Sequence, residues 1–256
     1  MIRRLPILTL LLLTLMLPAR AQKTELTVSA AASLKEALTT IGHDFGRQQP
    51  NVVLRFNFAS SGTLQRQIEQ GAPVDVFVSA AEKNMNELAS QNLVDARTQR
   101  VVAGNQLVLV VPQSSTRNGA NSIRGFRDLA RADVRHVAIG APASVPAGKY
   151  AQQVLVKIGV WNQISPKAIQ AKDVREVLTQ VELGNVEAGI VYRSDAAVSS
   201  KVRVVAVAPE TSHSPIRYSA AVVRDSQNPQ EARSFVSFLT SAKAKAVFKK
   251  LKFDVK

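Results

Sequence analysis

The feature that most constrains the fold is a repeated alternation of short apolar runs with amphipathic helical patterns. Residues 26–30 form an apolar run that ends in small residues, and the pattern that follows places four apolar residues of 34–45 on one helical face. Residues 52–58 and 74–78 are further strand candidates, and each precedes a helical pattern of its own. Three strand–helix units in succession predict a parallel sheet with helices on its faces.

A second series of the same kind follows a polar stretch at residues 118–122, which is typical of a loop. The apolar run 106–111 leads into this series, and helical patterns separate most of its strands. The remaining predicted strands are 137–140, 168–171, 187–192, 202–207 and 216–223. The chain ends in two helical patterns that place phenylalanines inward.

The alternation therefore predicts an α/β protein with two lobes, each a mainly parallel sheet flanked by helices. Two crossing segments, near residues 105 and 208, would join them. We expect residues 22–104 and 209–256 to form the first lobe, and residues 105–208 the second.

Residues 1–21 have the character of a secretion signal. Arg3 and Arg4 precede an apolar run, and the segment ends in small residues of the Ala-x-Ala type. The run is too short to span a bilayer, for which ~20 apolar residues are needed. We expect a mature chain that begins near Gln22 and is exported to the periplasm.

Composition narrows the possible functions. The chain has no cysteine, which excludes disulfides, thiolate metal sites, a catalytic thiol and a lipid anchor on an N-terminal cysteine. Its formal net charge is +14, and removal of three arginines with the signal leaves +11. The positive charges are scattered and export separates the chain from nucleic acid, so a field that attracts anions is the better interpretation.

Two strand-to-helix junctions of the first half carry hydroxyl groups. Such junctions expose unpaired backbone N–H groups and the positive end of a helix dipole, which together bind anions. Ser33 and Glu36 have the spacing of a capping box, which would leave the serine proton available for a ligand, although a plain helix cap is the alternative. Ser61, followed by Gly62, lies in a second such turn, and both turns end predicted strands of one lobe.

Two junctions of the second half offer backbone donors. Pro146 suits an early helix position, where it leaves the Ala147 N–H free to point at an anion. Asp173 begins a second capping-box pattern and would expose the Val174 N–H. Tyr192 follows at the end of a predicted strand and could donate its phenol proton, although a lone tyrosine is more often a core or rim residue.

At these residues the chain resembles a known family, the periplasmic molybdate-binding proteins of ABC transporters, which are type II periplasmic binding proteins. The likeness covers nearly the whole mature chain and depends on the order and spacing of six short motifs. These are AAASL at 30–34, FASSGTL at 58–64, GAPVDVF at 71–77, VPAG at 145–148, DVR at 173–175 and GIVY at 189–192.

The resemblance implies a two-lobed periplasmic-binding-protein fold that holds molybdate or tungstate between its lobes and delivers it to a membrane permease. It implies ligand contacts from Ser33, Ser61, the Ala147 and Val174 N–H groups and the Tyr192 hydroxyl. Gly62 departs from the family pattern, in which serine is common. If a side-chain hydroxyl at this position contributes to binding, the affinity is altered, whereas the backbone N–H is still present. We expect a monomer with no cofactor and no catalytic residues.

Uncharged donors predict which oxyanions such a site would select. A fully deprotonated dianion matches a donor at every oxygen, whereas a protonated phosphate brings a donor that finds no acceptor. Sulfate has the same charge and shape but is smaller, so fixed donors would contact it poorly.

Other functions remain as alternatives. A binder of sulfate, phosphate or an organic anion is the nearest competitor, and a hydrolase is more remote, because no HExxH, Gly-x-Ser-x-Gly or Ser-x-x-Lys motif is present. The three histidines form no cluster for a cationic metal. The C-terminal lysines at 243–252 would serve a membrane-surface role, but the solvated face of a helix explains them more simply.

Overall fold

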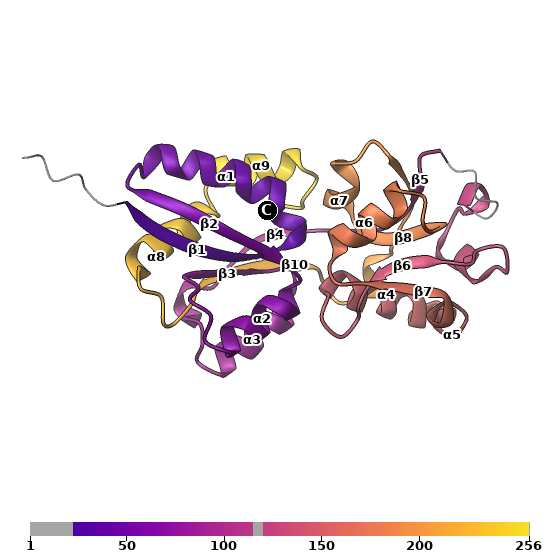
Figure 1. Ribbon diagram of the computed structural model, residues 1–256, viewed down its shortest axis with the longest axis horizontal. Coiled ribbons are helices and arrows are strands. Elements are labelled where there is room, and N and C mark those ends of the chain that lie inside the picture. Colours follow the sequence, from indigo (N-terminus) through magenta and orange to yellow (C-terminus); the bar gives the residue numbers. More distant parts are fainter. Residues whose placement is uncertain (1–22, 115–119, 256) are drawn as a thin grey trace, which may run out of the picture.

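A computed structural model describes residues 23–114 and 120–255. The chain forms two lobes that lie side by side along the longest axis of the molecule (Figure 1). The predicted secretion signal lies outside the described residues. Among the described residues, no helix is both long and apolar enough to cross a membrane.

The first lobe is built on a five-stranded sheet with the order β2-β1-β3-β10-β4. β1, β2 and β3 pair in parallel, and β10 pairs antiparallel with both β3 and β4. Four of the five strands therefore run in one direction, and β10 alone is reversed. The strands are β1 Thr24–Ala31, β2 Val52–Ala59, β3 Val76–Ser79, β4 Arg100–Gly104 and β10 Arg217–Val222.

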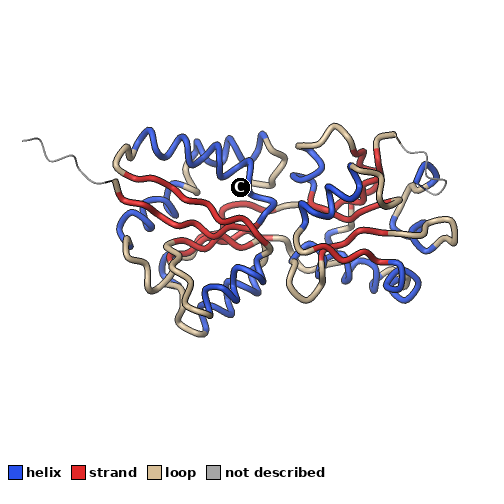
Figure 2. The backbone as a smooth tube through the Cα atoms, viewed as in Figure 1, coloured by secondary structure: helices blue, strands red, loops and turns tan. Residues whose placement is uncertain are grey.

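Helices cover both faces of this sheet because its strands alternate apolar side chains between two cores. Val76 and Val78 of β3 pack with the helices α1, α8 and α9, whereas Phe77 packs in a separate cluster with α2 and α3. Figure 2 shows these helices on either side of the strands. The helices are α1 Lys35–Gln48, α2 Ser61–Glu69, α3 Glu82–Ser90, α8 Pro229–Phe238 and α9 Ala242–Lys250.

The second lobe repeats this plan in a sheet with the order β7-β6-β8-β5-β9. β7, β6 and β8 are parallel, and β5 is the reversed strand, antiparallel to β8 and β9. The strands are β5 Leu107–Pro112, β6 Val137–Gly140, β7 Ala168–Ala171, β8 Ala188–Tyr192 and β9 Val202–Val207. α6 Val174–Glu182 and α7 Arg193–Ala197 lie on one face, and α4 Pro146–Lys157 and α5 Trp161–Ile164 on the other (Figure 1).

Short 3₁₀ turns complete the chain. They are η1 Ala32–Leu34, η2 Ala96–Thr98, η3 Ala120–Ser122, η4 Phe126–Ala130, η5 Ser165–Lys167 and η6 Glu210–Ser212. Residues 105–106 connect β4 to β5 and residues 208–216 connect β9 to β10, so the chain passes between the lobes twice.

The predicted two-lobed α/β fold is confirmed, with one strand not foreseen. β4 is a short edge strand, and a register irregularity interrupts its pairing with β10 between Tyr218 and Ser219. Its Arg-Val-Val-Ala-Gly sequence gives little alternation from which to predict a strand.

Candidate functional site

A small cavity lies between the lobes, where the carboxyl ends of strands from the first lobe face helix starts of the second. The cavity is small, with an empty volume of about 210 Å³ that includes the solvent at its mouth. The first lobe contributes Ala31, Ala32, Ser33, Ala59, Ser60, Ser61 and Ala80, and the second contributes Val145, Pro146, Ala147, Asp173, Val174 and Tyr192. All five residues predicted as ligand contacts therefore line one cavity.

Ser60 and Ser61 make different hydrogen bonds at the start of α2. Ser60 is the N-cap, and its hydroxyl accepts from the Thr63 N–H at 3.3 Å and donates to the Thr63 hydroxyl at 2.9 Å. The Ser61 hydroxyl is fully buried and accepts from the Ala80 N–H at 2.9 Å. This contact uses the Ser61 oxygen and not its proton, so the proton is available to a ligand in the cavity.

Ser33 lines the cavity, but the capping box expected with Glu36 is absent. Ser33 lies inside the 3₁₀ turn η1, whose first cap is Ala31, and α1 begins at Lys35 without a side-chain cap. The Ser33 hydroxyl is instead 3.0 Å from the hydroxyl of Tyr218 on β10. The local sequence pattern failed here because a tertiary partner replaced the local cap.

Helix α4 brings a backbone donor to the cavity. Pro146 occupies its first turn, where a missing N–H leaves no intrahelical bond unmade, and Ala147 follows it, fully buried. Gly148 lets this turn lie directly on the end of β6, since a Cβ there would overlap the Gly140 carbonyl. The close packing fixes the start of α4, and with it the Ala147 N–H.

Helix α6 brings the second backbone donor. The Asp173 carboxylate caps the helix by accepting from the Arg175 N–H at 2.8 Å and the Glu176 N–H at 3.0 Å. The Glu176 carboxylate accepts from the Lys172 N–H at 2.8 Å, one residue before the partner that a capping box requires. Within the described part of the chain, no hydrogen bond uses the Val174 N–H, the first of the helix.

Tyr192 ends β8 with its ring buried. Its hydroxyl has no hydrogen-bond partner among the described residues. Burial raises the pKa of the Tyr192 phenol well above its usual value, so the group stays protonated and can only gain by donating. An unpaired buried donor is costly, and a ligand oxygen in the cavity would satisfy it.

Arg175, the neighbour of Val174 in the sequence, pairs with two carboxylates rather than with the cavity. The Arg175 guanidinium forms an ion pair with Glu36 of the other lobe, and its Nε is 2.9 Å from Oδ1 of Asp195. Burial raises the pKa of the Asp195 carboxyl to about 6, and Arg175 opposes that rise. No lysine or arginine is among the described residues that line the cavity.

The Gly62 N–H is present, as expected, but it is used in a contact between the lobes. It donates to the Ser144 carbonyl of the second lobe at 3.0 Å. A Cβ at Gly62 would lie 2.5 Å from that oxygen, so glycine permits this direct backbone contact between the lobes.

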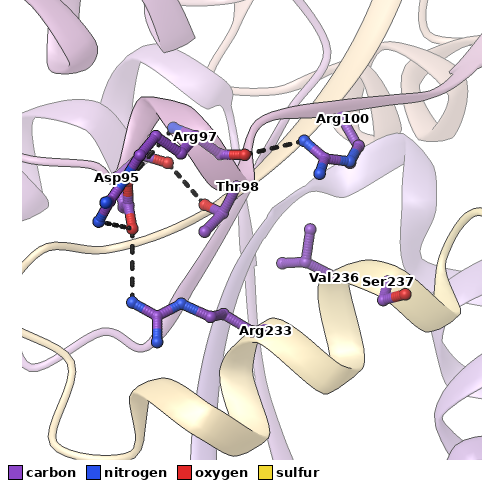
Figure 3. A pocket seen from close by; sticks show the side chains of 7 residues that line it. All are labelled: Asp95, Arg97, Thr98, Arg100, Arg233, Val236 and Ser237. Atoms are coloured by element: carbon purple, nitrogen blue, oxygen red, sulfur yellow. Dashed lines mark hydrogen bonds and ion pairs between the residues drawn. The ribbon is translucent and has the colours of Figure 1, made fainter.

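A second hollow lies on the first lobe alone (Figure 3). It is lined by Asp95, Arg97, Thr98, Arg100, Arg233, Val236 and Ser237. Asp95 pairs with Arg97 at 3.0 Å and with Arg233 at 3.4 Å, and Arg100 donates to two backbone carbonyls. Hydrogen bonding from Arg97 lowers the pKa of Asp95 to about 2. These charges have partners already, so the cavity between the lobes is the stronger candidate site.

The residues around the cavity offer hydrogen-bond donors rather than metal ligands. Among the described residues, no group of histidine and carboxylate side chains could hold a metal ion. Sequence patterns did not reveal Tyr218 or Asn105, whose amide donates to the Tyr218 hydroxyl at 3.2 Å. These contacts join residues more than 100 positions apart, so no local motif predicts them.

The chain is similar to known proteins over most of its length. Residues 26–252 match a family model described as bacterial extracellular solute-binding protein. The molybdate-binding protein ModA of Haemophilus influenzae is 39% identical over 92% of this chain and 92% of its own. A putative ABC transporter substrate-binding lipoprotein of Bacillus subtilis, YvgL, is 40% identical over 91% of this chain and 87% of its own.

Solved structures show the same fold. The periplasmic molybdate-binding protein of Azotobacter vinelandii superposes with a TM-score of 0.79 at 24% identity, covering 90% of this chain and 99% of its own. The sulfate-binding protein SubI of Mycobacterium tuberculosis has a TM-score of 0.77 at 19% identity, covering 90% of this chain and 86% of its own.

Proposed function

The chain belongs to the bacterial extracellular solute-binding proteins, and we propose that its solute is molybdate, with tungstate as a second ligand, held in the cavity between the lobes. The observation that carries this proposal is a cavity in which both lobes present uncharged hydrogen-bond donors. The proposed contacts are the hydroxyls of Ser33, Ser61 and Tyr192 and the backbone N–H groups of Ala147 and Val174.

This donor set favours a dianion that carries no proton. Helix starts place partial positive charge at the cavity, and the hydroxyls add protons without adding a full charge. A protonated oxyanion would bring one donor too many. The relatives at 39% identity that are named as molybdate-binding favour molybdate over sulfate.

The transport role follows from the family and from the position of the site. The family acts outside the cytoplasm, and we propose the periplasm as the compartment. A ligand that touches both lobes stabilises their closed arrangement, which a membrane ABC permease would recognise. We further propose a monomer without enzymatic activity, with lobe boundaries between residues 104 and 105 and between 208 and 209.

Thermal-shift screening of the purified mature protein tests this function. Molybdate and tungstate at about 100 times the Kd should raise the Tm by roughly 5–10 °C, because a ligand bound only by the folded state adds about 2.7 kcal/mol. Sulfate, phosphate and chromate are the comparison ligands. A larger shift with sulfate or phosphate would replace molybdate as the solute, and no shift with any oxyanion would refute the proposal.

A further inference from the structure

We propose that Tyr218 and Asn105, neither of which lines the cavity, are positioning residues that orient the Ser33 hydroxyl as a donor to the bound oxyanion. The inference rests on the proposed function and adds a determinant of its selectivity. It is carried by a chain of buried hydrogen bonds that runs from the segment between the lobes to the cavity.

Asn105 sets the donor-to-acceptor direction of this series of hydrogen bonds. Its Oδ1 accepts from the Gln106 N–H at 2.9 Å, and because a backbone N–H can only donate, that atom must be the amide oxygen. The Nδ2 group then donates to the Ser194 hydroxyl at 2.8 Å and to the Tyr218 hydroxyl at 3.2 Å. Both amide protons are thereby used, and neither contact can run in reverse.

Tyr218 is the donor in its contact with Ser33. Its side chain is fully buried, and burial raises the pKa of the phenol well above its usual value, so it keeps its proton. Its oxygen accepts from Asn105, and among the described residues the Ser33 hydroxyl, at 3.0 Å, is the one partner that can take the Tyr218 proton. Ser33 is then the acceptor in that contact, and its own proton is left for the cavity.

The Ser61 and Tyr192 hydroxyls also keep a proton for the cavity, but without a side-chain relay. Ser61 accepts from a backbone N–H, and Tyr192 has no partner among the described residues. Ser33 alone depends on a side-chain relay, so its orientation can be changed by mutation. Without the relay, the Ser33 oxygen could accept a hydrogen bond, and discrimination against a protonated oxyanion should fall.

The test is calorimetric titration of the mature protein with molybdate, with phosphate as competitor and sulfate as the unprotonated reference. Tyr218→Phe keeps the ring that packs against Tyr192 and Phe253 but removes the relay hydroxyl. We expect molybdate to bind roughly three- to tenfold more weakly, the value of one hydrogen bond. The ratio of molybdate to phosphate affinity should fall, while the ratio of molybdate to sulfate affinity stays constant.

A double-mutant cycle separates the relay from a general structural effect. If Tyr218 acts through Ser33, adding Tyr218→Phe to Ser33→Ala should not weaken binding further. Tyr150→Phe removes a hydroxyl from another buried tyrosine, one that takes no part in these hydrogen bonds, and is the matched control.

Asn105→Asp is the second variant, to be used if Tyr218→Phe fails to fold. The aspartate carboxylate is an acceptor at the place where the Asn105 amide now donates to Tyr218, so this variant should also lower the ratio of molybdate to phosphate affinity.

The outcomes separate the two proposals. Additive effects in the cycle, or a molybdate-to-phosphate ratio unchanged by the relay variants, would overturn the relay while leaving the function intact. Wild-type protein that binds no oxyanion would remove both.

Discussion

The two lobes bring different kinds of donor to the cavity. The first lobe supplies the side-chain hydroxyls of Ser33 and Ser61, whereas the second supplies the backbone N–H groups of Ala147 and Val174 together with the Tyr192 phenol. A backbone N–H is aimed by the helix that contains it and survives most substitutions. A hydroxyl rotates and needs a neighbour to orient it, so the first lobe depends more on individual side chains.

Arg175→Met should give the largest effect, by removing the charge that supports the second lobe. Asp195 is fully buried and accepts from the Tyr192 N–H at 3.2 Å, so its carboxylate helps to hold the end of β8. Removing one member of a buried ion pair costs about 3–5 kcal/mol of unfolding free energy, because the other charge is left unpaired. Urea denaturation measures this loss.

The pH dependence of that loss identifies Asp195 as its source. Burial raises the pKa of Asp195 to about 6, from an unfolded value of about 3.9, so its contribution to stability is full below about pH 4 and is lost as the pH rises through 6. Without Arg175 the pKa rises further and the loss extends above pH 6. The variant should therefore be more destabilised at pH 8 than at pH 5, and Asp195→Asn should relieve the difference. Equal destabilisation at both pH values would exclude this cause.

Val174→Pro removes a backbone donor of the second lobe while sparing the helix. Position 174 is the first residue of α6, where proline is tolerated, and Asp173 already has the extended conformation that a following proline requires (φ −155°, ψ 173°). We expect a loss of about 1.5–3 kcal/mol in molybdate affinity by calorimetry, the value of a hydrogen bond to a charged group. Val174→Ala retains the N–H and is the control. Equal affinity of the two variants would contradict the proposed contact.

Ser33→Ala and Ser61→Ala test the first lobe in the same way. Each should weaken molybdate binding by about 1–3 kcal/mol in calorimetry, because each removes a proton donated to the oxyanion. Ser60→Ala is the matched control, since the Ser60 hydroxyl is occupied in capping α2 and its loss should lower stability rather than affinity. Unchanged affinity in both Ser33 and Ser61 variants would count heavily against the site.

Much of the fold could be predicted from the sequence because its signals are local. The strands at 168–171 and 202–207 have the bounds predicted from the sequence, and the helices α1 and α6 bury the predicted apolar faces. The reversed directions of β5 and β10 were not foreseen, because strand direction depends on where the chain crosses between the lobes. Periodicity carries no information on that choice.

In the site, too, a contact between near neighbours in the sequence was predicted and contacts between distant residues were not. Asp173 caps α6 as its spacing predicted, because a cap is a contact between residues two and three positions apart. Ser33 and Gly62 found partners in distant parts of the chain instead, Tyr218 on β10 and Ser144 in the other lobe. Local patterns predicted which residues line the cavity but not how these two are held.

Glu36→Gln should have the smallest effect, and it asks whether charge helps to join the two lobes. Glu36 pairs with Arg175 across the cleft, but its side chain is 40% exposed and that of Arg175 21%, so water and salt screen the attraction. We expect molybdate affinity to fall by about 1 kcal/mol or less, and the loss to shrink as salt is raised. The substitution also removes a negative charge near an anion site, which acts in the opposite direction. Glu25→Gln removes the same charge from an exposed pair with Arg55 at the end of β1 away from the cavity, and so controls for the change in net charge. If Glu25→Gln weakens binding as much as Glu36→Gln, the pair between the lobes contributes nothing to closure, and the hydrogen bonds and packing at the cleft hold the lobes together without it.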